Sequence, residues 1–182
     1  MLRQTAFGIA LSTLVLASGL MTAPGPGNPS QKKADSHQPS SIPSSQVATT
    51  NLTFETTTLE KSVFVQINQY RISQGLPKLT INANITRQAR IHSLDMAKGK
   101  VPFSHQGFEG RVKAMPLIYD SAAENVAFNL GYSNPASQAV IGWLRSPGHL
   151  KNIRGKYNLT GIGVAANQEG KVYLTQIFLH TR

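Results

Sequence analysis

The hydrophobic pattern of this chain changes period near residue 160, and that change limits the possible folds more than any other feature. Before it, three segments carry apolar residues three and four positions apart, as on one face of a helix. After it, two β-prone runs flank a turn signal at 167–170. Helices followed by strands indicate an α+β fold in which helices layer on a sheet. The predicted helices lie within 57–74, 82–98 and 134–146, and the predicted strands are 160–165 and 171–179.

Helix boundaries follow from glycines, prolines and capping residues. Gly75 and Gly99 are expected to end the first two helices, because glycine adopts the left-handed conformation that closes a helix. The dipeptide Asn134-Pro135 predicts a cap and a first-turn proline for the third helix, which Pro147-Gly148 should stop. Residues 100–123 are predicted as a loop with one short turn around 111–115.

Cysteine is absent from all 182 residues. This excludes a disulfide-stapled secreted mini-domain, a thiolate zinc site, an iron–sulfur centre and a cysteine nucleophile. Any metal ion must be held by His, Asp or Glu.

The net charge of +10 is unevenly distributed. Residues 1–60 sum to zero, so the whole excess lies in residues 61–182. A folded unit this basic is attracted to anionic surfaces such as cell-wall polymers, acidic lipid headgroups or nucleic acid, although the charge also serves plain solubility.

The N-terminus is typical of an exported protein. Arg3 precedes an apolar run from Ala6 to Leu20, which is short for a membrane-spanning helix but suits a secretory signal, with cleavage after Gly19. Retention of this segment as an uncleaved anchor is the alternative. The following Ser/Thr/Pro-rich residues cannot bury enough surface to become ordered. We therefore predict a signal peptide at 1–19, a disordered linker at 20–57 and a globular domain at 58–182.

Two histidines and one acid are the candidate chemical residues. His105 and His149 are predicted in loops among turn-forming residues, where a loop can present an imidazole. Glu124 stands in an apolar neighbourhood and therefore needs a partner, for which an imidazole is suitable. His92 lies on the apolar face of a predicted helix, where a core histidine is the simpler interpretation.

An ordered series of motifs across residues 60–180 resembles the CAP superfamily, the SCP-like extracellular domain of cysteine-rich secretory, antigen and pathogenesis-related proteins, in its prokaryotic form. The series comprises Asn68-x-x-Arg71, Leu76-Pro77-x-Leu79, Ala89-x-x-His92-Ser93-x-Asp95-Met96, Ser104-His105, Ala123-Glu124-Asn125-Val126-Ala127, Trp143-x-x-Ser146-Pro147-Gly148-His149-x-x-Asn152-Ile153, Gly161-Ile162-Gly163-Val164 and Tyr173-x-Thr175-Gln176-x-Phe178.

The resemblance implies a three-layer α-β-α sandwich with a central cleft that holds two histidines and two acids, and in some members zinc on the two histidines. His105, Glu124 and His149 match three of those positions, so His105 and His149 are the implied zinc ligands. Asn125 and Ser146 are the other implied cleft residues, and Ser146 stands where the second acid is normal.

Glu109 is a possible substitute for the missing acid. The favoured function is a binding module, secreted or associated with the cell envelope, whose cleft takes a small molecule, a lipid or an anionic cell-wall polymer. The alternative is a metal-dependent hydrolase that uses Glu124 as general base. Nucleic acid is not an expected partner, membrane contact is expected at most through the N-terminal segment, and the oligomeric state is left open.

Overall fold

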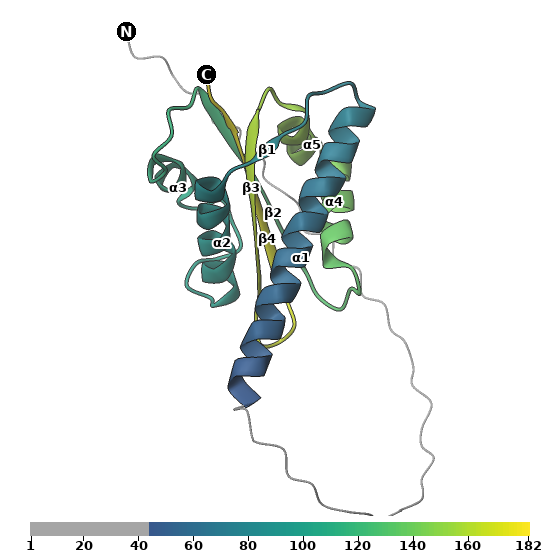
Figure 1. Cartoon of the computed structure of the whole chain (residues 1–182), viewed down its shortest axis with the longest axis vertical. Coiled ribbons are helices and arrows are strands. Elements are labelled where there is room, and N and C mark those ends of the chain that lie inside the picture. Colours follow the sequence, from purple (N-terminus) through teal and green to yellow (C-terminus); the bar gives the residue numbers. More distant parts are fainter. Residues whose placement is uncertain (1–43) are drawn as a thin grey trace, which may run out of the picture.

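The computed structural model of the chain describes residues 44–182, with side chains from residue 55 onward (Figure 1). The predicted signal peptide and most of the predicted linker lie outside these residues. The elements, in order, are α1 (Ser44–Ser73), β1 (Thr80–Ile81), α2 (Ala83–Ala97), α3 (Phe108–Lys113), β2 (Ser121–Asn129), α4 (Pro135–Arg145), α5 (Pro147–Arg154), β3 (Leu159–Ala166) and β4 (Val172–His180).

The four strands form one sheet in the order β1-β3-β4-β2. The predicted hairpin is present: β3 and β4 pair antiparallel, and Gly170 in their turn has a φ of 77°. β2 pairs antiparallel with β4 over its whole length and forms one edge of the sheet. β1 pairs only briefly with β3, through Thr80 and Ile81, at the other edge.

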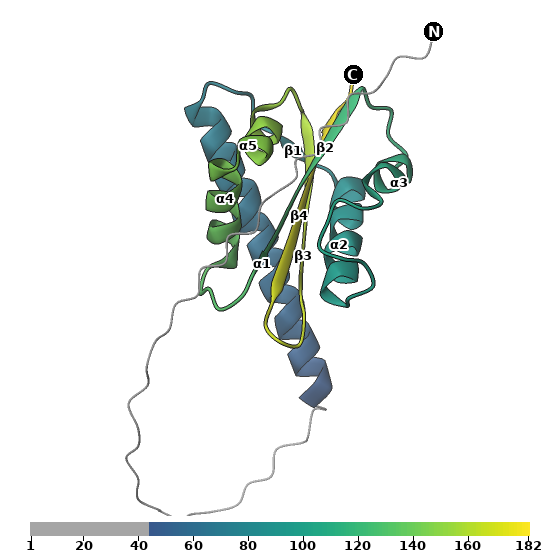
Figure 2. The same cartoon turned by 180° about the vertical axis from the view of Figure 1, so that it is seen from behind.

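Helices cover both faces of the sheet, so the fold is the α-β-α sandwich that the family resemblance implied. Figures 1 and 2 show α2 and α3 on one face and α1, α4 and α5 on the other. Each helical layer has its own core. Val63, Ile67 and Trp143 belong to the cluster on the α1 side, while Ile85 and Ile177 belong to that on the α2 side.

Two glycines of β3 allow α2 to pack closely on the sheet. A Cβ atom at Gly161 would overlap the backbone of Ile85 and Thr86, and one at Gly163 would overlap the backbone of Ala89 and Arg90. The helix and the strand therefore meet backbone to backbone.

The predicted domain boundary at residue 58 falls inside α1, which already begins at Ser44. Residues 44–57 are thus helical in the structure, where the sequence predicted linker. The packed residues Val63 and Ile67 anchor the helix. Extending an existing helix gains one hydrogen bond per residue, so a polar segment can continue it without an apolar face of its own.

Three local predictions were wrong. Pro147 ends α4 as expected but also starts α5, because its fixed φ suits the first turn of a helix. Within 100–123 the short helix spans 108–113 rather than the predicted turn at 111–115, and β2 begins at Ser121. β2 contains Ser, Ala, Glu and Asn, which have low strand propensity, so its formation depends on pairing with β4.

Candidate functional site

Glu124 lies on the edge strand β2 and is buried, with 1% of its surface exposed. Neighbouring residues of β2 face opposite layers. Ala122 packs in the core on the α2 side, whereas Ala123 packs in the core on the α1 side. The two-residue period of a strand then directs Glu124 toward the α2 and α3 side. A carboxylate removed from water in this way requires charged or hydrogen-bonding partners.

Arg111 of α3 provides the main partner. Its Nη2 donates to Oε1 and Oε2 of Glu124, each at 2.8 Å, and its Nε donates to Oε2 at 3.1 Å. Its Nη1 donates to the carbonyl oxygen of Gln106 at 2.7 Å. The fork of the guanidinium thus engages both oxygens of the acid. Arg111 was not predicted as a site residue: a buried acid implies a cation, but nothing in the sequence shows which one lies close.

His105, in the loop between α2 and α3, also contacts the acid. Its Nδ1 lies 3.0 Å from Oε1 of Glu124. His92 of α2 is buried nearby and its Nε2 lies 2.9 Å from the carbonyl oxygen of Ser104, next to His105. Burial lowers the pKa of His92, and the charge of Glu124 partly opposes that effect. His92 is therefore a core histidine that holds the loop. We call Glu124, Arg111 and His105 the Glu124 centre.

His149 approaches from the opposite layer. It lies on α5 rather than in the predicted loop, is buried, and its ring centroid is 6.5 Å from that of Trp143. Burial, together with the positive charge of His105 when protonated, lowers the pKa of His149 to about 4. Its imidazole is consequently neutral at physiological pH. The effect of His105 on His149 indicates that the two predicted histidines lie near each other.

Asparagine side chains join α5 to β2. Asn125 Nδ2 donates to the carbonyl oxygen of His149 at 3.3 Å, and Asn152 Nδ2 donates to Asn125 Oδ1 at 2.9 Å and to the Glu124 carbonyl oxygen at 3.2 Å. All three side-chain contacts are buried. Asn125 therefore fixes the helix that carries His149, and Asn152, which sequence reasoning did not assign to the site, supports Asn125.

The two positions considered for a second acid do not provide one. Ser146 is half-buried at the junction of α4 and α5, and its side chain makes no capping hydrogen bond to α5. Glu109 is exposed on α3 and pairs with Lys113 at 2.8 Å.

The residues present do not form a zinc site of the usual kind, which needs three or four protein ligands. Across the described residues, no group of three or more His, Asp or Glu side chains is arranged to hold a metal ion. His105 and His149 offer two imidazoles, while both oxygens of Glu124 are engaged by a guanidinium.

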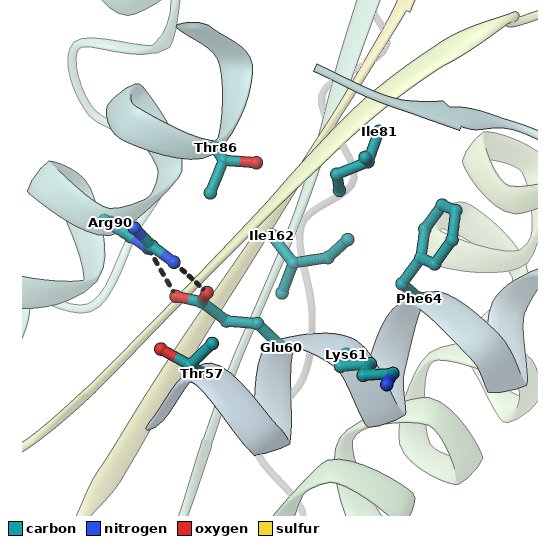
Figure 3. Close-up of a pocket in the computed structure, with 8 residues that line it drawn as sticks. All are labelled: Thr57, Glu60, Lys61, Phe64, Ile81, Thr86, Arg90 and Ile162. Atoms are coloured by element: carbon teal, nitrogen blue, oxygen red, sulfur yellow. Dashed lines mark hydrogen bonds and ion pairs between the residues drawn. The ribbon is translucent and has the colours of Figure 1, made fainter. Parts of the chain in front are cut away.

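A pocket of about 230 Å³ lies at the opposite edge of the sheet, between α1 and α2 (Figure 3). Phe64, Ile81 and Ile162 form its apolar wall. An ion pair crosses it: Arg90 donates to the two carboxylate oxygens of Glu60 at 2.8 and 2.6 Å. Glu60 also accepts the backbone N–H of Val164 at 3.2 Å. The ion pair therefore caps a part of β3 that β1 does not cover.

Comparison with known proteins assigns the family. The model of the family described as "CAP: Cysteine-rich secretory protein family" matches residues 65–178. This chain belongs to the CAP family. The matched residues contain the Glu124 centre, α5 and the whole β3–β4 hairpin except its last two residues.

Two curated relatives come from Bacillus subtilis (strain 168). The CAP chain is 34% identical over 134 residues to the "Uncharacterized protein YkwD", covering 70% of this chain and 50% of that protein. It is 33% identical over 129 residues to the "Uncharacterized membrane protein YlbC", covering 68% of this chain and 35% of that protein. The chain thus spans half or less of the length of these relatives.

Solved structures share the CAP fold at low identity. An extracellular protein containing an SCP domain from Bacillus anthracis str. Ames superposes with a TM-score of 0.61 at 23% identity, over 78% of this chain and 45% of that one. An outer surface protein from Borrelia burgdorferi superposes with a TM-score of 0.58 at 16% identity, over 68% of this chain and 93% of that one. Those two are described as extracellular and outer-surface proteins. Among residues 44–182, no helix has both the length and the apolar character needed to span a bilayer.

Proposed function

We propose that this CAP domain is a binding module, secreted or attached to the cell envelope, that holds an anionic cell-surface polymer. The observation that carries the proposal is a concentration of uncompensated positive charge on the same short helix as His149. Lys151 and Arg154 are exposed in the last turn of α5. Arg154 bonds only to neutral groups among its described partners, the Tyr70 hydroxyl at 2.7 Å and Gln74 Oε1 at 2.9 Å.

Two loops extend this charge. Arg71 donates to the carbonyl oxygens of Pro77, Gly155 and Tyr157, so the loops 74–79 and 155–158 meet around one buried guanidinium. Each loop carries an exposed lysine, and neither 70–79 nor 145–158 contains Asp or Glu. We call the resulting surface the basic end; it comprises Lys78, Lys151, Arg154 and Lys156. A linear polyanion suits such a surface, because each cation can meet a separate charge along it.

The Glu124 centre supports binding more than catalysis. A general base needs a free carboxylate oxygen within reach of the proton that it removes. Arg111 and His105 contact both oxygens of Glu124. The alternative function, a metal-dependent hydrolase with Glu124 as base, therefore has less support. Weak zinc binding through His105 and His149, and a small molecule or a lipid as ligand, stay predictions.

The test uses the full chain and immobilised polyanions. Polyphosphate and polyglutamate serve as phosphate- and carboxylate-bearing probes, with dextran as neutral control and vesicles of phosphatidylglycerol as the lipid arm. The double variant Lys78→Glu/Lys156→Glu should bind polyanions at least about 10-fold more weakly than the wild type, and the wild-type affinity should fall as salt rises.

A matched control changes the net charge equally but elsewhere. Arg87 and Lys98 are exposed on and just after α2, so Arg87→Glu/Lys98→Glu should leave most of the affinity in place. Equal losses in the two double variants would show only general charge attraction and would overturn the assignment to the basic end. Stronger binding to the vesicles than to either polymer would identify a lipid surface instead.

A further inference from the structure

A carboxylate that binds a metal ion needs an oxygen available for that ion. In this structure the guanidinium of Arg111 contacts both carboxylate oxygens of Glu124. Arg111 donates to both oxygens of Glu124 through two of its nitrogens, and its third nitrogen donates to the Gln106 carbonyl oxygen. The Arg111 side chain is 11% exposed and that of Glu124 is 1% exposed, so the pair is largely removed from water.

We propose that Arg111 is the built-in cation of the Glu124 centre. It neutralises Glu124 in place of a divalent metal ion and keeps that carboxylate from joining His105 and His149 around a metal. Arg111 is then the residue that sets the metal selectivity of this site: it limits zinc to two imidazole ligands and leaves the centre close to neutral overall.

Burial gives Glu124 an electrostatic need for a partner of opposite charge. A carboxylate removed from water is stable only with a counter-charge, which a metal ion or a basic side chain can supply. An arginine supplies it at every physiological pH, because its guanidinium does not lose its proton there. Its planar fork also matches the two oxygens of a carboxylate, so a competing metal ion does not readily displace the guanidinium from the pair.

Arg111 is held firmly in place by its surroundings. It lies on α3, whose residues Phe108 and Val112 are buried in the core on the α2 side. Arg111 Nη1 bonds to the loop just before that helix. The guanidinium is therefore held by its own helix, by the loop next to His105 and by the acid. A zinc ion at His105 would approach this fixed positive charge, which opposes its binding.

The proposal predicts a gain of function. Removing the charge at 111 leaves Glu124 buried without its cation and leaves the carboxylate oxygens to His105 and any metal ion. Arg111→Met keeps much of the side-chain volume without charge. It should bind zinc at least about 10-fold more tightly than the wild type, as isothermal titration measures. Arg111→Lys retains a cation and should stay close to the wild-type zinc affinity.

A second variant tests whether Glu124 is the recruited ligand. In Arg111→Met/Glu124→Gln both charges are absent, so this protein should fold but lose the gain in zinc affinity. Thermal melting gives an independent readout. Without metal, the melting temperature of Arg111→Met should be lower than that of the double variant, and added zinc should substantially raise the melting temperature of Arg111→Met alone. If Arg111→Met folds only when zinc is present, the proposal is supported in the same way.

Three results would overturn it. These are an unchanged zinc affinity in Arg111→Met, a gain that persists after Glu124→Gln, or an Arg111→Met protein that zinc cannot rescue while the double variant folds. The inference goes beyond the proposed function, because it concerns metal binding at the buried Glu124 centre and not polymer binding at the basic end. Because zinc titration involves no polymer and the basic end is not altered, failure of one test leaves the other informative.

Discussion

Arg71 donates from Nη1 to the carbonyl oxygen of Ile153 at 2.6 Å, across 82 positions of sequence. The same buried side chain bonds to three further carbonyl oxygens in the loops after α1 and α5, and burial lowers its pKa. All four of these acceptors are backbone oxygens, so the cation ties the loop after α1 to the end of α5 and the loop that follows it. The Arg71 side chain is therefore a structural support for the surface that we call the basic end.

Replacing Arg71 should destabilise the protein strongly. Arg71→Met removes the donor from four carbonyl oxygens, three of them far along the chain, and should lower the free energy of unfolding by about 3 kcal/mol or more. Urea denaturation measures this. The control is Arg154→Met. The guanidinium of Arg154 is exposed and lies 5.6 Å from the centroid of the Tyr70 ring, so this substitution should lower the free energy of unfolding by less than about 1 kcal/mol. Similar losses in both variants would contradict the supporting role of Arg71.

The close contact between β3 and α2 should make Gly163 irreplaceable. Gly163→Ala adds a methyl group that overlaps the backbone of Ala89 and Arg90, so the free energy of unfolding should fall by about 3 kcal/mol or more. Gly142 in α4 has open space around the position of a Cβ atom. Gly142→Ala should raise stability by up to about 1 kcal/mol through helix propensity. A mild Gly163→Ala would mean that α2 can move away from the sheet.

Stability should fall between pH 6.5 and pH 4 because of His149. Its pKa is about 4 in the folded protein, against roughly 6.5 in the unfolded chain. In this window the unfolded chain binds more protons, so acidification favours unfolding, whereas above pH 6.5 the group has no effect. From pH 7 to pH 5 the contribution is about 2 kcal/mol.

The measurement is urea unfolding at both pH values with a chelator present, for the wild type and for His149→Gln. Because the carboxylates are common to both proteins, the difference between their pH dependences isolates His149. The variant should lose about 2 kcal/mol less than the wild type over this range. Identical pH dependences would show that His149 is not held neutral by burial.

Glu60 should protect the protein from aggregation, because it covers an edge of β3. Glu60→Ala removes the acceptor of the Val164 N–H and the partner of Arg90, so it should cost about 2 kcal/mol and speed aggregation from an exposed strand edge. Glu60→Gln keeps an oxygen acceptor and should aggregate more slowly than Glu60→Ala. Glu169→Ala, in the exposed hairpin turn, is the control. Light scattering at elevated temperature measures the aggregation rates of the three variants, and equal aggregation rates would refute the capping role.

Periodic segments with local stop signals were predictable, whereas elements that depend on distant pairing were not. The helix of Ile85 and Ala89, the cap at Asn134 and the hairpin around Gly170 all rest on contacts within a few residues. β2 was missed because most of its residues have low strand propensity, Val126 and Phe128 excepted. α5 was missed because Pro147 was interpreted only as the end of one helix and not also as the start of the next. Both elements exist because β4 and the core on the α1 side supply partners.

The sequence by itself determined the helical faces, the hairpin, the absence of thiol chemistry, the basic balance of the domain and, through its ordered motifs, the CAP family. It also indicated His105, Glu124 and His149 as candidate site residues, and Glu124 as an acid that needs a partner. Only the tertiary structure decided which groups these residues contact. Arg111 meets Glu124 across 13 positions, and Asn125 meets the His149 carbonyl across 24. Such pairs leave no periodic or local signal, because the fold of the intervening chain, rather than its spacing, sets the distance between them.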